Sequence, residues 1–223
     1  MLYLVFNEGY SATSGDVRVR ADLCEEAIRL AKLLAVLMPD EAEALGLLAL
    51  MLLHDARREA RTTSDGAIVL LAEQDRARWN ADRIAEGVRV LERALSLRNP
   101  GPYQLQAAIG ALHVEARRPE ETDWEQIAGL YATLARMDGS PIVALNRAVA
   151  VAMAEGPEHG LKLIEAIELP GYHLLPATRA DLLRRLDRLD EAAVAYAEAL
   201  ELEMNAADRA YLERRLDEVS AGR

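Results

Sequence analysis

Residues 160–169 (GLKLIEAIEL) and residues 193–202 (AVAYAEALEL) align without a gap at an offset of 33 residues. The two segments share four identical residues: two Glu, one Ala and one Leu. A repeat of this period is typical of proteins built from stacked helix pairs, because each pair must bury its apolar face against the next pair. The repeat therefore predicts a helical stack in the last third of the chain.

The composition extends this prediction to the whole chain. Of the 223 residues, 51% are hydrophobic but only 4% are aromatic. Ala, Leu, Glu and Arg dominate and are strong helix formers, whereas strand-favouring residues are sparse. We expect an all-α fold of antiparallel helical hairpins, stacked as a tetratricopeptide-like right-handed superhelix, because the offset is close to the 34 residues of that repeat.

Two regions are expected along this stack. Residues 1–121 form an N-terminal helical region, and residues 122–223 form the repeat region, which a polar-faced helix at residues 205–219 closes. The sequence Thr122-Asp123-Trp124-Glu125 fits a capping box at the start of the second region. We expect the two regions to be continuous with each other.

The first region begins with a predicted helical hairpin. Apolar residues at helical spacing predict a helix from Asp22, and Pro39 ends it and opens a second helix that runs to about Arg61. The expected buried stripe of the first helix consists of Leu23, Ala27, Leu30, Leu34 and Leu37.

The densest polar and aromatic cluster is residues 74–80 (QDRARWN). If it lies on one helix, Asp75 and Trp79 share one face and Gln74 and Arg78 share another. Two interpretations stay open: a buttress within the scaffold, which the helical spacing of Trp79 favours, or the wall of a binding site. A polar pocket becomes credible if the cluster lies beside Tyr103 and Gln104, which have the same mixture of ring and amide.

The sequence shows no pattern that predicts catalysis. The histidines at positions 54, 113, 159 and 173 fall in different predicted elements, without His-Glu-x-x-His or Cys-His spacing. His54-Asp55 could be an oriented base, but no serine nucleophile elbow or glycine-rich phosphate loop accompanies the pair. We expect no enzyme activity, catalytic residue, metal or cofactor.

Charge and cysteine content restrict the partners and the compartment. The formal net charge is −11, from 26 basic and 37 acidic residues, and an acidic surface repels nucleic acid. Cys24 is the only cysteine, so no internal disulfide is possible, which fits a reducing cytoplasm. The longest apolar run, residues 44–53, has about half of the roughly 20 residues needed to cross a bilayer. Residues 1–6 lack the basic start and the length of a signal peptide.

Several blocks of the sequence, in order, resemble successive motifs of one known family. They are residues 2–10 (LYLVFNEGY), 22–30 (DLCEEAIRL), 46–61 (GLLALMLLHDARREAR), 74–80 (QDRARWN), 101–109 (GPYQLQAAI) and 141–150 (PIVALNRAVA). The chain resembles the large C-terminal extension, with tetratricopeptide-like repeats, of one group of bacterial extracytoplasmic-function (ECF) sigma factors. The resemblance covers essentially the whole chain.

This resemblance implies a regulatory, protein-binding role in transcription initiation. The promoter- and polymerase-binding sigma domains of that family precede the extension, and nothing similar to them is present here. The expected partners are the sigma core domains, RNA polymerase or a signalling protein, with no direct contact to nucleic acid or membrane. The apolar first ten residues either continue a helix from a longer protein or pack back on this one.

An alternative function is a helical domain that senses a small ligand near residues 74–79 and 103. The candidate binding or interaction residues for both functions are Tyr3, Phe6, Asn7, Glu8, Tyr10, Gln74, Asp75, Arg76, Trp79, Tyr103 and Gln104.

Overall fold

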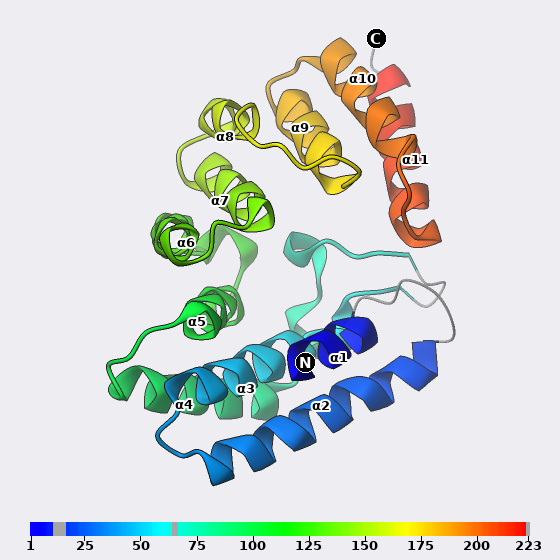
Figure 1. Cartoon of the computed structure of the whole chain (residues 1–223). Coiled ribbons are helices and arrows are strands. Elements are labelled where there is room, and N and C mark those ends of the chain that lie inside the picture. The colour runs from blue at the N-terminus through cyan, green and yellow to red at the C-terminus, as the bar shows by residue number, and fades with distance from the viewer. Residues whose placement is uncertain (11–16, 64–66, 222–223) are drawn as a thin grey trace. The chain divides into compact units, whose positions relative to one another are not determined.

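The computed structural model describes residues 1–10, 17–63 and 67–221 (Figure 1). Within these ranges the chain forms eleven α-helices and four short 3-10 helices. The α-helices are α1 (Leu2–Tyr10), α2 (Val17–Leu37), α3 (Ala42–Asp55), α4 (Ala81–Ser96), α5 (Pro102–Glu115), α6 (Trp124–Met137), α7 (Pro141–Ala154), α8 (Pro157–Ile164), α9 (Leu174–Arg185), α10 (Leu189–Leu200) and α11 (Ala206–Ala221). The 3-10 helices are η1 (Arg58–Ala60), η2 (Leu71–Glu73), η3 (Arg76–Arg78) and η4 (Pro119–Glu121).

The prediction of an all-α fold of stacked helices is confirmed. Helices that follow one another in the chain pack against each other within each part of the molecule. In the described ranges, no helix is both long enough and apolar enough to cross a membrane.

The chain divides into two compact units. The first unit comprises Met1–Thr63 and Val69–Thr122, and the second comprises mainly Asp123–Arg223. Whether the two regions expected from the sequence form one continuous body stays a prediction.

Helix α3 is the centre of the first unit. Twelve of its fourteen residues are buried, because α1, α2, α4 and α5 pack around it (Figure 1). A helix that is apolar on every side has to be covered on every side. The run of ten apolar residues at 44–53 is therefore the axis around which the first unit assembles.

Helix α2 buries a slightly different stripe from the predicted one. Cys24, Ala27 and Ala31 are fully buried, but Leu37, which was expected on the stripe, is 70% exposed. The prediction was wrong at Leu37 because no described helix covers that side of the last turn of α2.

Helices α3 and α5 approach each other closely at Gly46. A Cβ atom on Gly46 would lie 2.8 Å from the backbone nitrogen of Gln104, closer than Cβ atoms are found. The carboxylate of Glu43, one turn earlier, accepts hydrogen bonds from the backbone amides of Tyr103 (3.0 Å) and Gln104 (3.1 Å). A side chain of α3 thus satisfies amides that the first turn of α5 leaves without intrahelical partners.

The second unit stacks helices α6 to α11 in chain order (Figure 1). The two similar segments begin in α8 and in α10, which follow α7 and α9 respectively. They differ at their ends, because α8 stops at Ile164 and leaves residues 165–169 outside the helix, whereas α10 continues to Leu200. Fully buried alanines such as Ala148, Ala152 and Ala192 let neighbouring helices pack closely. The helix expected to end the stack is α11, which packs against α10.

Two local predictions need correction. Residues 74–80 do not form one helix: Arg76–Arg78 is a single 3-10 turn, and α4 begins at Ala81 after Asn80, whose side chain caps it. At the start of α6 the capping residue is Asp123 rather than Thr122, because the carboxylate of Asp123 accepts the amide hydrogen of Gln126.

Candidate functional site

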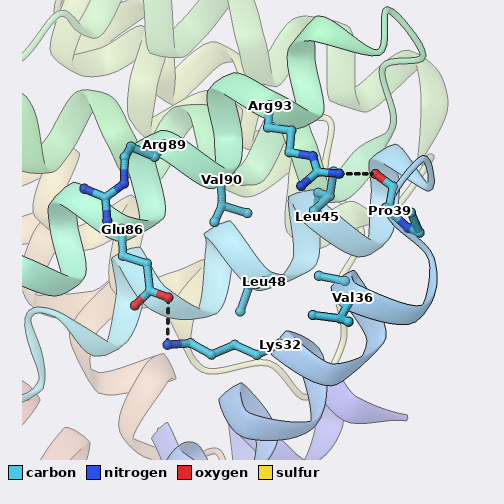
Figure 2. A pocket seen from close by; sticks show the side chains of 10 residues that line it. Lys32, Val36, Pro39, Leu45, Leu48, Glu86, Arg89, Val90 and Arg93 are labelled. Atoms are coloured by element: carbon cyan, nitrogen blue, oxygen red, sulfur yellow. Dashed lines mark hydrogen bonds and ion pairs between the residues drawn. The ribbon is translucent and has the colours of Figure 1, made fainter.

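A groove of about 500 Å³ lies between α2 and α4 in the first unit, with α3 as its floor (Figure 2). Leu45 and Leu48 of α3 and Val90 of α4 supply an apolar floor, and Ala35 and Val36 of α2 supply one wall. Volumes of about 300–1,000 Å³ are typical of binding sites. The groove is therefore large enough to receive several side chains of a partner.

Local sequence explains the two walls of the groove. Pro39 follows the end of α2 and starts the turn into α3, which leaves the last turn of α2 beside the first turns of α3. On α4, Glu86 and Val90 are four residues apart, as are Arg89 and Arg93, so each pair lies on one face of the helix. Val90 consequently faces the floor while both arginines stand at the rim (Figure 2).

Two interactions fix the ends of the groove. The Lys32 ammonium lies 2.7 Å from a carboxylate oxygen of Glu86, which joins α2 to α4. The Arg93 guanidinium donates a hydrogen bond of 3.1 Å to the carbonyl oxygen of Pro39 (Figure 2). These contacts tie the two walls together at both ends of the groove.

The positive charges of the rim are only partly neutralised. Among the residues that the structure describes, Arg89 has no hydrogen bond or ion pair, and Arg93 bonds a carbonyl but no carboxylate. Only Lys32 is paired with an acid. Two guanidinium groups without an acidic partner therefore stand on the same rim, one helical turn apart on α4.

An exposed apolar surface continues from the groove over the end of α2. Val36 is 75% exposed and Leu37 is 70% exposed, and Leu33 and Met38 beside them are about half exposed. Single exposed apolar residues are normal, but a contiguous group next to a groove is a mark of interaction sites.

A buried ion network lies among the three helices that form this groove. The Asp55 carboxylate, at the end of α3, is almost fully buried and pairs with the guanidinium groups of Arg83 and Arg58. Arg83 and Arg58 also reach the Glu25 carboxylate on α2, at 2.7 and 3.2 Å. Burial by itself raises the pKa of Glu25, but the two guanidinium groups outweigh it and hold that pKa below its ordinary value. The network joins α2, α3 and α4.

The cluster at residues 74–80 is bonded internally. Trp79 is only 7% exposed, and the Arg76 guanidinium lies 4.7 Å from the centre of its ring. Arg76 Nε also donates a 3.0 Å hydrogen bond to the carbonyl of Ala116. The Asp75 carboxylate caps the amide of Ala77, and the Gln74 amide donates to the carbonyl of Val69. This geometry favours the buttress interpretation.

Tyr103 and Gln104 lie far from that cluster. They occupy the first turn of α5, whereas Ala116, the partner of Arg76, follows the last residue of the same helix. Thirteen residues of α-helix span about 20 Å. Gln104 is buried and donates to the carbonyl of Asn99 and to Glu43. The described residues thus form no pocket shared by Trp79 and Tyr103.

The aromatic residues of α1 pack inward. Phe6 is fully buried and stacks on Tyr10, and the Tyr3 ring meets the Tyr103 ring edge-on with centroids 5.5 Å apart. Burial raises the pKa of Tyr3, while a hydrogen bond with Asn7 opposes that shift. Glu8 lies on the exposed side of α1. Of the two alternatives for the N-terminal segment, the structure therefore shows the one in which it packs back on the chain.

Two histidines lie in a positively charged environment between α3 and α5. The His54 ring packs against Tyr10 with centroids 5.3 Å apart. Burial, with the positive charges of Arg57 and Arg61, lowers the pKa of His54 to about 3. Burial and the charges of Arg57 and Arg76 lower the pKa of His113 to about 4. Both imidazoles are therefore neutral at pH 7.

The other two histidines are in the second unit, on α8 and before α9. Across the described ranges, no group of three or more His, Cys, Asp or Glu residues is arranged to hold a metal ion.

Sequence reasoning missed the groove residues Val36, Arg89 and Arg93. A usable signal was present in the sequence, because Arg89 and Arg93 are four residues apart and therefore share one face of the predicted helix. The apolar group Leu33, Val36, Leu37 and Met38 also exceeds what one buried stripe of a helix requires.

Comparisons with known proteins give matches to the part of the chain that contains the groove. Residues 1–95 match a family described as a family of unknown function (DUF6596), and this segment includes all the residues that line the groove. The chain is also similar to an uncharacterized protein of Rhizobium meliloti (strain 1021), with 50% identity over 223 residues. The match covers 99% of this chain and 53% of the relative. The chain thus spans about half the length of the curated relative that it matches.

Proposed function

We propose that this chain is a regulatory, protein-binding region of a bacterial ECF sigma factor. It acts on transcription initiation through contacts with the sigma core domains, with RNA polymerase as a further partner, in the cytoplasm. It does not bind promoter DNA itself. The ordered motif blocks described above and the stacked helices support this proposal.

The observation that carries the proposal is the length of the relative. A protein 50% identical to this chain over almost all of its residues is nearly twice as long, so about half of it lies outside the match. A region of that size is sufficient for the two helical domains that recognise promoter and polymerase in the resembled family. The present chain would then be the part that modulates them.

The net charge of the chain supports the proposal that another part of the protein contacts the promoter. A sigma core must approach DNA, and a net charge of −11 opposes such an approach by this region. The same charge suits a region that contacts protein surfaces and keeps away from the promoter.

An assay in trans tests the proposal. The part of the Rhizobium meliloti relative outside the match is combined with core RNA polymerase from the same organism and genomic DNA, with and without the 223-residue chain, and the transcripts are sequenced. We expect the chain to change the yield at the start sites that the added part creates, and to bind that part or the polymerase in a pull-down. An unchanged transcript profile together with no binding would contradict the proposal.

A further inference from the structure

The groove between α2 and α4 combines exposed apolar surface with positive charge that lacks an acidic partner. The floor is formed by Leu45, Leu48 and Val90, and the apolar surface extends over Val36 and Leu37. A ligand that satisfied both features would need an apolar face bordered by carboxylates.

The spacing of the two arginines specifies how those carboxylates are arranged. Arg89 and Arg93 are one helical turn apart, so their side chains start about 6 Å from each other. Glu or Asp residues three or four positions apart on a second helix have the same separation. A helix lying along the groove could therefore pair with both guanidinium groups while its apolar side chains enter the space over the floor.

We infer that this groove binds an acidic amphipathic helix from the part of the longer protein that lies outside this chain. The inference rests on the proposed function and specifies its contact surface. The carboxylates of the helix pair with Arg89 and Arg93, and its apolar residues pack on Val36, Ala35 and Val90, which keep exposed surface in the groove. Helix-in-groove recognition of this kind uses anchors at positions i, i+3 or i+4, and i+7.

Two features favour this occupant over others. The relative has about as much chain outside the match as inside it, which is ample length for such a helix. Glu86, the acidic residue in the lining of the groove, is already paired with Lys32. The two arginines of the rim are thus available for acids supplied from outside.

The test compares groove variants with matched controls. The probe is the part of the Rhizobium meliloti relative outside the match, and its affinity for the whole 223-residue chain is measured by isothermal titration at low and high salt. The variants are Val36→Asp and the double change Arg89→Gln with Arg93→Gln. The controls are Val194→Asp on α10, a valine that is 60% exposed, and Arg209→Gln on α11, an exposed arginine.

We expect each groove variant to bind the probe at least about tenfold more weakly than the wild type, and the controls to bind normally. The double arginine variant should also lose most of the salt dependence of binding, because its charge pairs are gone. All changed side chains are exposed, so thermal unfolding should confirm that the variants fold.

Three outcomes would overturn the inference. If the wild type binds the probe and the groove variants bind equally well, the helix docks elsewhere and the proposed function stands. If the chain alone dimerises and Val36→Asp abolishes the dimer, a second copy covers the groove. If the wild type neither binds the probe nor alters transcription, the proposed function fails together with this inference.

Discussion

Glu43 on α3 caps the first turn of α5, with its Oε1 atom 3.1 Å from the backbone nitrogen of Gln104. The Oε2 atom of the same carboxylate accepts the amide hydrogen of Tyr103. The two helices are therefore joined by a charge-assisted cap as well as by apolar packing. Capping normally comes from the residue before a helix, but here that residue is Gly101, which has no side chain to offer.

Replacing Glu43 by Ala should destabilise the first unit. The change leaves the amides of Tyr103 and Gln104 without their acceptor, and loss of a cap costs about 1–2 kcal/mol. Urea unfolding followed by circular dichroism measures the loss. Glu41→Ala is the control, since Glu41 precedes α3 and its side chain makes no capping hydrogen bond. Equal stability of the two variants would contradict this role.

Breaking the buried ion network should destabilise the first unit more than the loss of the Glu43 cap. Asp55→Ala removes the buried carboxylate and leaves the partly exposed Arg83 with Glu25 alone, and removing one partner of a buried pair costs up to about 3–5 kcal/mol. The exposed pair of Glu26 and Arg29 on α2 provides the contrast, because solvent screens it. Glu26→Gln should leave the urea midpoint almost unchanged. A small effect of Asp55→Ala would show that Glu25 alone can hold both arginines.

Two glycines in the second unit should respond to alanine with opposite signs. A Cβ atom on Gly160 would lie 2.7 Å from the carbonyl oxygen of Ala148, so Gly160→Ala forces α7 and α8 apart and should cost about 1–3 kcal/mol. Gly129, within α6, has open space at the same position. Gly129→Ala should stabilise by about 0.5–1 kcal/mol through helix propensity. Thermal unfolding of the two variants measures both changes in stability. If both variants were stabilised or both destabilised, the contact described for Gly160 or the open space described at Gly129 would be contradicted.

The histidines His54 and His113 should make the stability fall in mild acid. Their pKa values are about 3 and about 4 in the folded chain, below the ordinary 6.5, so the unfolded chain binds more protons between pH 6.5 and about 4. The contribution of the neutral imidazoles is fully present above pH 6.5 and is lost as the pH falls through this window. Each histidine should lower the free energy of unfolding by up to about 1.4 kcal/mol for each pH unit within this window.

Urea unfolding between pH 7.5 and pH 5 measures this dependence before the carboxylates titrate. Changing His54 to Gln should reduce the slope of the free energy of unfolding against pH. A stability that does not vary across this range would show that both imidazoles can be protonated in the folded chain.

Sequence periodicity predicted the helices well because burial repeats every 3.6 residues in this fold. The similar segments at residues 160–169 and 193–202 begin in α8 and α10 of the second unit, although α8 ends at Ile164, and the apolar run at residues 44–53 is the buried axis of the first. Periodicity did not predict the path of residues 74–80, where capping decides the structure. Asp75 and Asn80 each cap the turn that follows them, and both residue types compete with the backbone for hydrogen bonds.

The groove could not be derived from the spacing of apolar residues. Leu37 was expected on the buried stripe of α2, but Cys24, Ala27 and Ala31 are buried on another face of the helix and Leu37 stays exposed. Which apolar residues find a partner depends on contacts between helices far apart in the chain. The pairing of charges could not be derived from sequence spacing either. Glu86 and Arg89 are one turn apart on α4, but only Glu86 meets an opposite charge, from Lys32.

The central claim is that this region regulates a sigma factor, and transcription by the longer relative tests it most directly. The whole Rhizobium meliloti protein and a version without the segment similar to this chain are each combined with core RNA polymerase and genomic DNA, and start sites are counted. We predict that the whole protein directs initiation at a discrete set of promoters and that removing the segment changes the yield there severalfold. Equal yields from the two proteins, or no start sites beyond those of polymerase alone, would contradict the account.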